Sequence, residues 1–238
     1  MEQAIETLRR WIDESERIVF FGGAGVSTES GIPDFRSVDG LYHLKYKYPP
    51  ETILGHSFFL KNTEEFYEFY RDKLIAPWAL PNAAHYKLAQ WEAEGKLKAV
   101  ITQNIDGLHQ LAGSKEVLEL HGSVHRCYCN KCRKVYHESF VNDGTGVPKC
   151  DCGGIVRPDV VLYEEALDDS VVTKAIRYIM SADMLIIGGT SLNVYPAAGL
   201  IHYYTGKKLV LINRSTVPAN AQANLVVLGK IGEVFSQI

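Results

Sequence analysis

The sequence lacks the features that mark membrane, secreted and nucleic-acid-binding proteins. None of its apolar runs approaches the roughly 20 residues needed to span a bilayer. The opening segment MEQAIETLRRWIDESER is charged throughout, so we expect neither a signal peptide nor a membrane anchor. The net charge is only −3 and Lys and Arg form no cluster, which argues against direct nucleic-acid binding. These absences predict a soluble protein of the cytoplasm.

Cysteine is missing outside one short segment. All five cysteines lie between Cys127 and Cys152. An odd number of clustered cysteines, without an export signal, argues against a disulfide framework and favours a metal site. Cys129 and Cys132 form a C-x-x-C pair, and Cys150 and Cys152 supply a second pair after a spacer of about 17 residues, as in ribbon-type zinc sites.

These two cysteine pairs are the predicted zinc ligands. Four thiolates complete a tetrahedral shell and leave no position for water, so the ion is expected to be structural. The second pair is C-x-C, one residue shorter than the usual C-x-x-C. Cys127, His125 and His137 therefore stay open as substitutes for one ligand.

Short apolar runs alternate with helical patterns along most of the chain. This alternation predicts an α/β fold, a doubly wound parallel Rossmann-like sheet with helices on both faces. Helical spacing occurs at residues 2–15, 82–95, 105–112 and 168–181, and from about residue 196. The runs typical of buried strands are 17–21, 97–102, 117–120, 183–189, 208–213 and 224–229.

Two regions interrupt the alternation and predict a second, smaller lobe within a single domain, 1–238. One region is rich in tyrosine and contains the helical TEEFYEFYRDKL, and the other contains the cysteines. We expect a helical insertion at 36–79 and a zinc ribbon at 123–157 to form the small lobe. The large lobe would then comprise 1–35, 80–122 and 158–238.

The first predicted strand leads into the stretch FFGGAGVSTESGIPDFR, residues 20–36. Gly23, Gly25 and Thr28 form G-x-G-x-x-T, in which the glycines allow a backbone to approach a pyrophosphate closely. The third glycine of a dehydrogenase loop is missing, and no strand with an acidic end follows at about 20 residues. The loop is either a simple glycine turn or a dinucleotide site for something other than hydride transfer.

Polar residues also follow other predicted strands, in TQNIDGLH (102–109), LELHGSV (118–124) and GGTSLNVYPAAGL (188–200). Helix caps explain the first and third segments, and a structural histidine explains the second. However, ligands of open α/β sheets bind at the carboxyl ends of the strands. Convergence of these loops on one sheet edge favours a common binding site.

Taken together, GAGVSTESGIPDFR, TQNIDGLH, HGSVHRCYCNKC, CDCGGIVRPDVV and GTSLNVYPAA resemble the ordered signature blocks of the sirtuins, NAD-dependent protein deacylases. The resemblance extends over about residues 20–213. It implies NAD as co-substrate, one structural Zn2+ and acyl-lysine proteins or peptides as substrates. It also implies removal of acetyl or other neutral acyl groups from lysine, with release of nicotinamide and O-acyl-ADP-ribose.

Matching positions in those blocks imply roles for individual residues. His121 would be the catalytic base, which acts after nicotinamide has left by helping a ribose hydroxyl attack. Asn104 would face the nicotinamide ribose beside it, and Val161 would hold the amide of the acyl-lysine. The expected NAD contacts are Ala24, Thr28, Phe35, Arg36, Gln103, Ile105, Asp106, Thr190, Ser191, Asn213 and Ile231.

The sequence departs from the sirtuin pattern at two further places. Glu164 stands where sirtuins commonly have glycine, and its carboxylate is expected to favour peptides with basic flanking residues. Sirtuins that remove acidic acyl groups carry Tyr-x-x-Arg, whereas Arg71 here is four residues after Tyr67. One extra residue turns a side chain about 100° around a helix, so we expect the guanidinium to lie off the tyrosine face and neutral acyl groups to be preferred.

Two other functions stay open. A mono-ADP-ribosyltransferase would use the same activation of NAD with a different acceptor. A non-catalytic nucleotide- or peptide-binding module would not need His121 together with Asn104 and Asp106. We expect a monomer that has neither nucleic acid nor a membrane as a direct partner.

Overall fold

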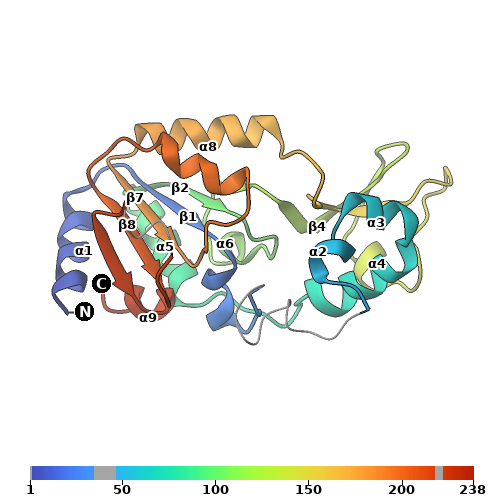
Figure 1. Cartoon of the computed structure of the whole chain (residues 1–238), viewed down its shortest axis with the longest axis horizontal. Helices are drawn as coiled ribbons and strands as arrows, with labels where there is room; N and C mark the ends of the chain where they lie inside the picture. Colours follow the sequence, from blue (N-terminus) through green and yellow to red (C-terminus); the bar gives the residue numbers. More distant parts are fainter. Residues whose placement is uncertain (1, 35–46, 218–221) are drawn as a thin grey trace.

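One parallel sheet forms the core of the larger part of the structure, a computed structural model that describes residues 2–34, 47–217 and 222–238 (Figure 1). Its order is β3-β2-β1-β7-β8-β9, and every pair of neighbouring strands is parallel. The order reverses between β1 and β7, where open α/β sheets bind their ligands. The strands are β1 (Ile18–Gly22), β2 (Leu97–Thr102), β3 (Val117–Glu119), β7 (Met184–Gly188), β8 (Leu209–Asn213) and β9 (Leu225–Leu228).

All six strands predicted from the sequence are confirmed. Their apolar residues are continuous because helices cover both faces of the sheet. Phe20 packs on the face covered by α1 (Glu2–Glu14), α5 (Ala83–Ala93) and α9 (Ile231–Phe235). Its neighbour Phe21 packs on the opposite face, against α8 (Asp169–Ser181) and the 3-10 helix η5 (Ala197–Tyr203).

Side chains fix where two of these helices begin. Asn82 accepts a hydrogen bond from the backbone N–H of Ala84 at the start of α5, and Asp168 accepts one from Ser170 at the start of α8. Two 3-10 turns and one short helix occupy the loops after β1 and β2, namely η1 (Ala24–Val26), η2 (Thr28–Ser30) and α6 (Leu108–Leu111). None of the helices in the described ranges has the length and apolar character needed to cross a membrane.

The two insertions pack on each other beside the sheet (Figure 1). Their shared core contains Phe59 and Phe66 from the helical insertion and Val141 and Val156 from the cysteine-containing one. The antiparallel sheet of the second insertion has the order β5-β4-β6. The elements are α2 (Pro50–Ile53), α3 (His56–Lys61), α4 (Thr63–Phe69), the π-helical turn η4 (Tyr70–Leu74), β4 (Gly122–Cys129), β5 (Val135–Tyr136), α7 (Ser139–Asn142) and β6 (Val156–Val160).

This shared core supports a small lobe distinct from the main sheet. β6 pairs with β4 as far as Val160, past the predicted boundary at residue 157. The exact division into lobes stays a prediction, to be checked by limited proteolysis.

Candidate active site

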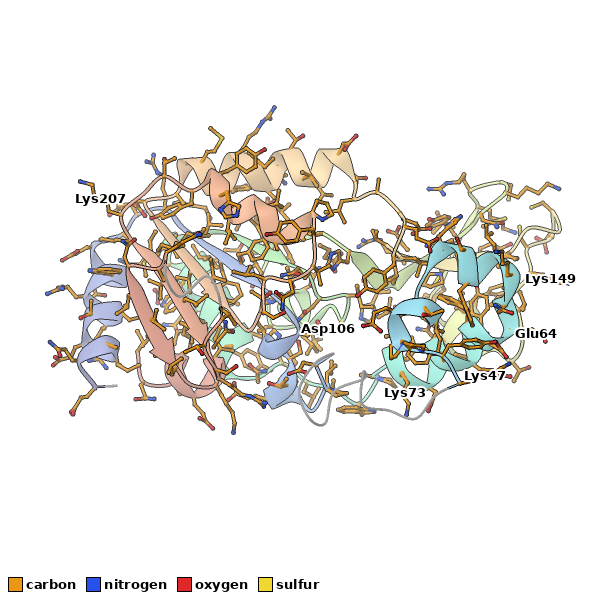
Figure 2. The ribbon with its side chains drawn as sticks, viewed as in Figure 1. Lys47, Glu64, Lys73, Asp106, Lys149 and Lys207 are labelled. Atoms are coloured by element: carbon orange, nitrogen blue, oxygen red, sulfur yellow. The ribbon has the colours of Figure 1, made fainter. Side chains whose placement is uncertain are left out.

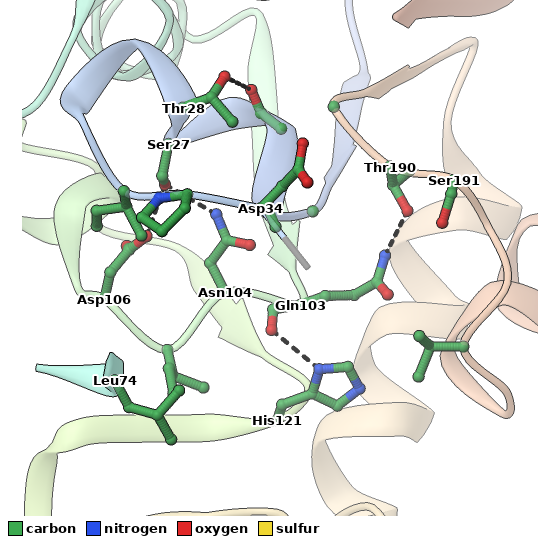
Figure 3. Close-up of a pocket in the computed structure, with 18 of the residues that line it drawn as sticks. Ser27, Thr28, Asp34, Leu74, Gln103, Asn104, Asp106, His121, Thr190 and Ser191 are labelled. Carbon is green, nitrogen blue, oxygen red and sulfur yellow. Dashed lines mark hydrogen bonds between the residues drawn. The ribbon is translucent and has the colours of Figure 1, made fainter. Parts of the chain in front are cut away.

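A cleft of about 630 Å³ opens at the carboxyl ends of β1, β2, β7 and β8 (Figure 3). Another wall of the cleft is formed by Val160, at the end of β6, and by residues 161–165 and 167 beyond it. The structure brings together here all the predicted site residues that it describes, apart from the cysteines. These are Ala24, Thr28, Gln103, Asn104, Ile105, Asp106, His121, Val161, Thr190, Ser191, Asn213 and Ile231. Phe35 and Arg36 lie outside the described residues.

The loops after β1 and β7 touch backbone to backbone. Gly25 donates its N–H to the carbonyl of Gly189 at 2.7 Å. A Cβ atom on Gly25 would lie 2.7 Å from the Cα of Gly189, and Gly189 itself has a φ of +61°. Glycine is therefore required at both positions by the packing of the two loops.

A second set of contacts joins the ends of β2, β7 and β8. The side-chain amide of Gln103 donates to the Thr190 hydroxyl at 3.0 Å. Asn213 accepts from the Thr190 N–H at 3.1 Å and donates to the Thr190 carbonyl at 2.9 Å. Thr190 and Asn213 are buried, so these bonds hold the strand ends in one register.

Ser27 is a functional candidate that sequence reasoning did not single out. Its hydroxyl donates to the Asp106 carboxylate at 2.6 Å and accepts from the Asn104 amide at 3.0 Å (Figure 3). The other carboxylate oxygen of Asp106 accepts from the Leu108 N–H at 3.0 Å, as a helix cap does. Burial raises the pKa of Asp106, and the bonds from Ser27 and Leu108 partly oppose that shift.

Only the position of Ser27, within the glycine-rich segment, could have signalled this role. The hydroxyl ties the loop after β1 to the loop after β2, a contact between residues 79 positions apart. No local pattern in the sequence reports such a pair.

His121 lies between β3 and β4, and a hydrogen bond at one ring nitrogen orients its imidazole. Nδ1 is 2.9 Å from the carbonyl oxygen of Gln103, which can only accept, so Nδ1 carries the proton and Nε2 keeps a lone pair (Figure 3). Burial lowers the pKa of His121, and the bond to Gln103 opposes this shift. A neutral imidazole near pH 7 can accept a proton at Nε2.

Gly122 sets the direction of the chain immediately after His121. Its φ is +76°, and a Cβ atom there would lie 1.8 Å from the Asp159 carbonyl oxygen. Only glycine allows β4 to pair with β6 so close to His121.

The four cysteines of the two predicted pairs converge. Their sulfur atoms all lie within 4.8 Å of one another, and the Cys129–Cys152 and Cys132–Cys150 distances are both 3.6 Å. Tetrahedral zinc with Zn–S bonds of about 2.3 Å requires sulfurs about 3.8 Å apart. The donor set and its spacing therefore fit one structural zinc ion.

None of the three possible substitutes belongs to this cluster. Cys127 is buried in the apolar core of the small lobe. The ring nitrogens of His125 face Asp106 and Glu138, and Nδ1 of His137 bonds Ser139. The shorter C-x-C pair is accommodated by the turn from Cys150 to Gly153, where Gly153 has a φ of +78°.

A family model described as the Sir2 family matches residues 23–196. The chain belongs to the Sir2 family. Relatives match over nearly their whole length. The NAD-dependent protein deacetylase of Clostridium acetobutylicum is 59% identical over 238 residues, which cover 98% of this chain and 97% of that protein. The protein of the same name from Clostridium perfringens is 59% identical over 242 residues, with coverages of 100% and 99%.

Solved Sir2 structures share the fold. A Sir2 variant with a deacetylated p53 peptide and 3′-O-acetyl ADP-ribose has a TM-score of 0.90 at 39% identity, covering 98% of this chain and 96% of that one. A Sir2–p53 peptide–NAD+ complex has a TM-score of 0.87 at 38% identity, with the same coverages. The predicted sirtuin family and α/β fold are thus confirmed.

The carboxylate of Glu164, which stands where sirtuins commonly have glycine, is already hydrogen-bonded within this protein. Its carboxylate accepts from the Ser57 N–H at 2.9 Å and from the Ser57 hydroxyl at 2.6 Å, and so caps α3. These bonds lower the pKa of Glu164. Because the charge already has two donors, it offers less to a basic peptide than we expected, and the preference for basic flanks stays a prediction.

The expected geometry of Tyr67 and Arg71 is wrong. The guanidinium lies over the Tyr67 ring, 5.2 Å from its centroid, because residues four apart share one face of a helix. Arg71 donates to the carbonyls of Val141 and Gly146, each at 2.8 Å, and the Tyr67 hydroxyl donates to Val156. Tyr67 thus belongs to the core of the small lobe, the partly buried Arg71 packs over it, and neither residue lines the cleft.

Proposed function

We propose that this chain removes acetyl groups from protein lysine side chains, with NAD as co-substrate, and yields deacetylated lysine, nicotinamide and O-acetyl-ADP-ribose. Membership of the Sir2 family and full-length relatives named NAD-dependent protein deacetylase support this function. The observation that carries it is the Nε2 lone pair of His121, in a cleft at the point where the strand order reverses. A binding module needs no such base.

NAD is proposed to lie along the carboxyl edge of the sheet. Its phosphates would lie near the Gly25–Gly189 contact, between Ala24 and Thr28. The nicotinamide riboside half would lie beside His121, surrounded by Gln103, Asn104, Ile105 and Asp106. The adenosine half would be held by Thr190, Ser191, Asn213 and Ile231. Contacts by Phe35 and Arg36 stay predictions.

The acyl-lysine peptide is proposed to bind beside Val161. The N–H of this residue donates to the His121 carbonyl at 3.0 Å, which places Val161 directly next to the base. Its carbonyl is then the backbone group that can accept a bond from the acyl-lysine amide. A peptide held this way is recognised mainly through its main chain, so many sequences can serve as substrate.

The zinc ion is proposed to be structural. Cys129, Cys132, Cys150 and Cys152 would hold it as four thiolates, and no open position is left for a substrate. Its contribution is to order the β5-β4-β6 sheet, whose strand β4 begins at Gly122, one residue after His121.

Product analysis tests the proposed reaction against ADP-ribosyl transfer to protein. The protein, NAD and an acetyl-lysine peptide are incubated, and the products are identified by mass spectrometry. We expect deacetylated peptide and O-acetyl-ADP-ribose in equal amounts. Transfer of ADP-ribose to the peptide or to the protein itself, with the acetyl group retained, would contradict the proposal.

The acyl preference and the assembly state can be tested with the same preparation. Acetyl, succinyl and myristoyl peptides are compared at equal concentration, and we expect the acetyl peptide to be turned over much faster than the succinyl peptide.

Light scattering is expected to give the mass of a monomer. Fractionation of the source cell is expected to place the protein in the cytoplasm.

A further inference from the structure

His125 connects the small lobe to the loop that carries Asp106. Its Nε2 is 3.0 Å from the Asp106 carbonyl oxygen, and its Nδ1 is 2.5 Å from a carboxylate oxygen of Glu138. His125 lies on β4, and Glu138 lies just before α7, in the insertion that holds the cysteines. Figure 2 shows Asp106 between the main sheet and helices α2–α4.

Both partners of the His125 ring are acceptors. A carbonyl and an ionised carboxylate offer only lone pairs, whereas a neutral imidazole has one N–H and a protonated one has two. The observed pair of contacts is therefore complete only when His125 is an imidazolium. Burial lowers the pKa of His125, but the bonds to Asp106 and Glu138 outweigh it and raise the pKa.

The charges around His125 favour the protonated ring. Glu119, on β3, adds to the effect of Glu138 and raises the pKa further. The nearest cation on its own strand is Arg126, which is paired with Glu119 at 2.6 Å and with Asp159 at 2.8 Å.

The His125 ring also packs closely against the backbone of the loop at Gly107. Gly107 has a φ of +69°, and a Cβ atom there would lie 2.7 Å from the His125 ring. The Ile105 carbonyl accepts from the N–H of Val124, the neighbour of His125, at 3.0 Å. β4 thus bonds the carbonyls of Ile105 and Asp106, and its His125 ring leaves no room for a side chain at Gly107.

We propose that His125 and Glu138 form an imidazolium–carboxylate support that positions Asp106, and that this support sets the affinity for NAD and nicotinamide and makes it fall as the pH rises and the ring loses its proton. The inference rests on the proposed function, which assigns Ile105 and Asp106 to the nicotinamide end of the cleft. Both members act through Asp106 and are positioning residues. Rising pH removes the proton, and one of the two bonds is then lost.

Glu138→Gln and His125→Gln test the support, with His137→Gln as the matched control because His137 is exposed in the same insertion. In both test variants we expect the KM for NAD to rise about tenfold, because a charge-assisted hydrogen bond is lost. The nicotinamide concentration for half-inhibition should rise by about the same factor, and kcat should change less. Because Glu138 raises the pKa of His125, Glu138→Gln should move the rise of KM with pH to lower pH, and His125→Gln should abolish that rise. The control should match the wild type.

Zinc content and Tm show whether a variant has lost only the positioning of Asp106 or its fold as well. Turnover by the wild type distinguishes a failure of this inference from a failure of the proposed function. If the wild type is active but both test variants keep its KM, inhibition and pH profile, the support does not exist. Variants that lose zinc, or lose kcat with unchanged KM, would also overturn it. An inactive wild type would instead refute the proposed function.

Discussion

Replacing His121 by alanine should separate the two halves of the proposed reaction. Proton transfer by a positioned side chain contributes typically 10²–10⁴-fold, so deacetylation should fall by about that factor, or roughly 3–5 kcal/mol in the barrier. In the proposed reaction, the base would be needed only after nicotinamide has left. Exchange of labelled nicotinamide into NAD should therefore survive far better than deacetylation.

The structural cost of this substitution is small. His121 is only partly buried, and its side chain makes one hydrogen bond, to Gln103. Loss of such a bond costs about 1 kcal/mol, which a folded domain tolerates. Zinc content and Tm near wild-type values should confirm that the fold is retained.

Both reactions are measured on the same protein preparation, deacetylation by chromatography of the peptide and exchange by radiolabel in NAD. The wild-type pH profile adds an independent check. The His121 pKa is lowered, so the midpoint of the acid-side fall in kcat/KM, where Nε2 becomes protonated, should lie below pH 6.5. Deacetylation within fivefold of wild type in His121→Ala, or an equal loss of exchange and deacetylation, would refute the assigned role.

Three further predictions concern the fold. Cys150→Ser should lose the zinc and lower Tm, whereas Cys127→Ser should keep one zinc per chain by elemental analysis; the opposite pattern would overturn the ligand assignment. His85 is buried, and burial lowers its pKa to about 4. The contribution of neutral His85 to the free energy of unfolding is fully present above pH 6.5. It falls by roughly 3 kcal/mol as the pH drops to about 4, because in that range only the unfolded chain gains the proton. His85→Gln, which keeps an acceptor for the Asn82 N–H, should flatten this loss in urea titrations at each pH, and an unchanged slope would argue against it. Gly122→Ala should cost about 2–4 kcal/mol, since its Cβ would collide with the Asp159 carbonyl, and a smaller loss would mean that β4 and β6 can shift apart.

The main sheet was predictable because its strands carry a local signal. Runs such as Ile18–Gly22 and Met184–Gly188 are apolar at almost every position and end at glycine, as buried parallel strands do. Since carboxyl ends of parallel strands share one edge, the meeting of the loops after β1, β2 and β7 also followed from the sequence. The cysteine spacing predicted the four-sulfur cluster in the same way.

What the sequence did not show depends on contacts between distant positions. Glu164 meets Ser57 at a separation of 107 residues, and Ser27 meets Asp106 at 79. Such pairs leave no periodic pattern, because their partners are chosen by how the loops pack rather than by spacing along the chain. The position of Arg71 over Tyr67 shows a further limit, since side-chain direction depends on neighbours from the other insertion, Val141 and Gly146, as well as on helical geometry.

Release of nicotinamide, followed in real time with each reactant alone and with both, is the most direct measurement of the proposed chemistry. We predict release only when NAD and an acetyl-lysine peptide are present together, in equal amount to the deacetylated peptide formed. The same rate of release without the peptide, or none with both, would contradict the account.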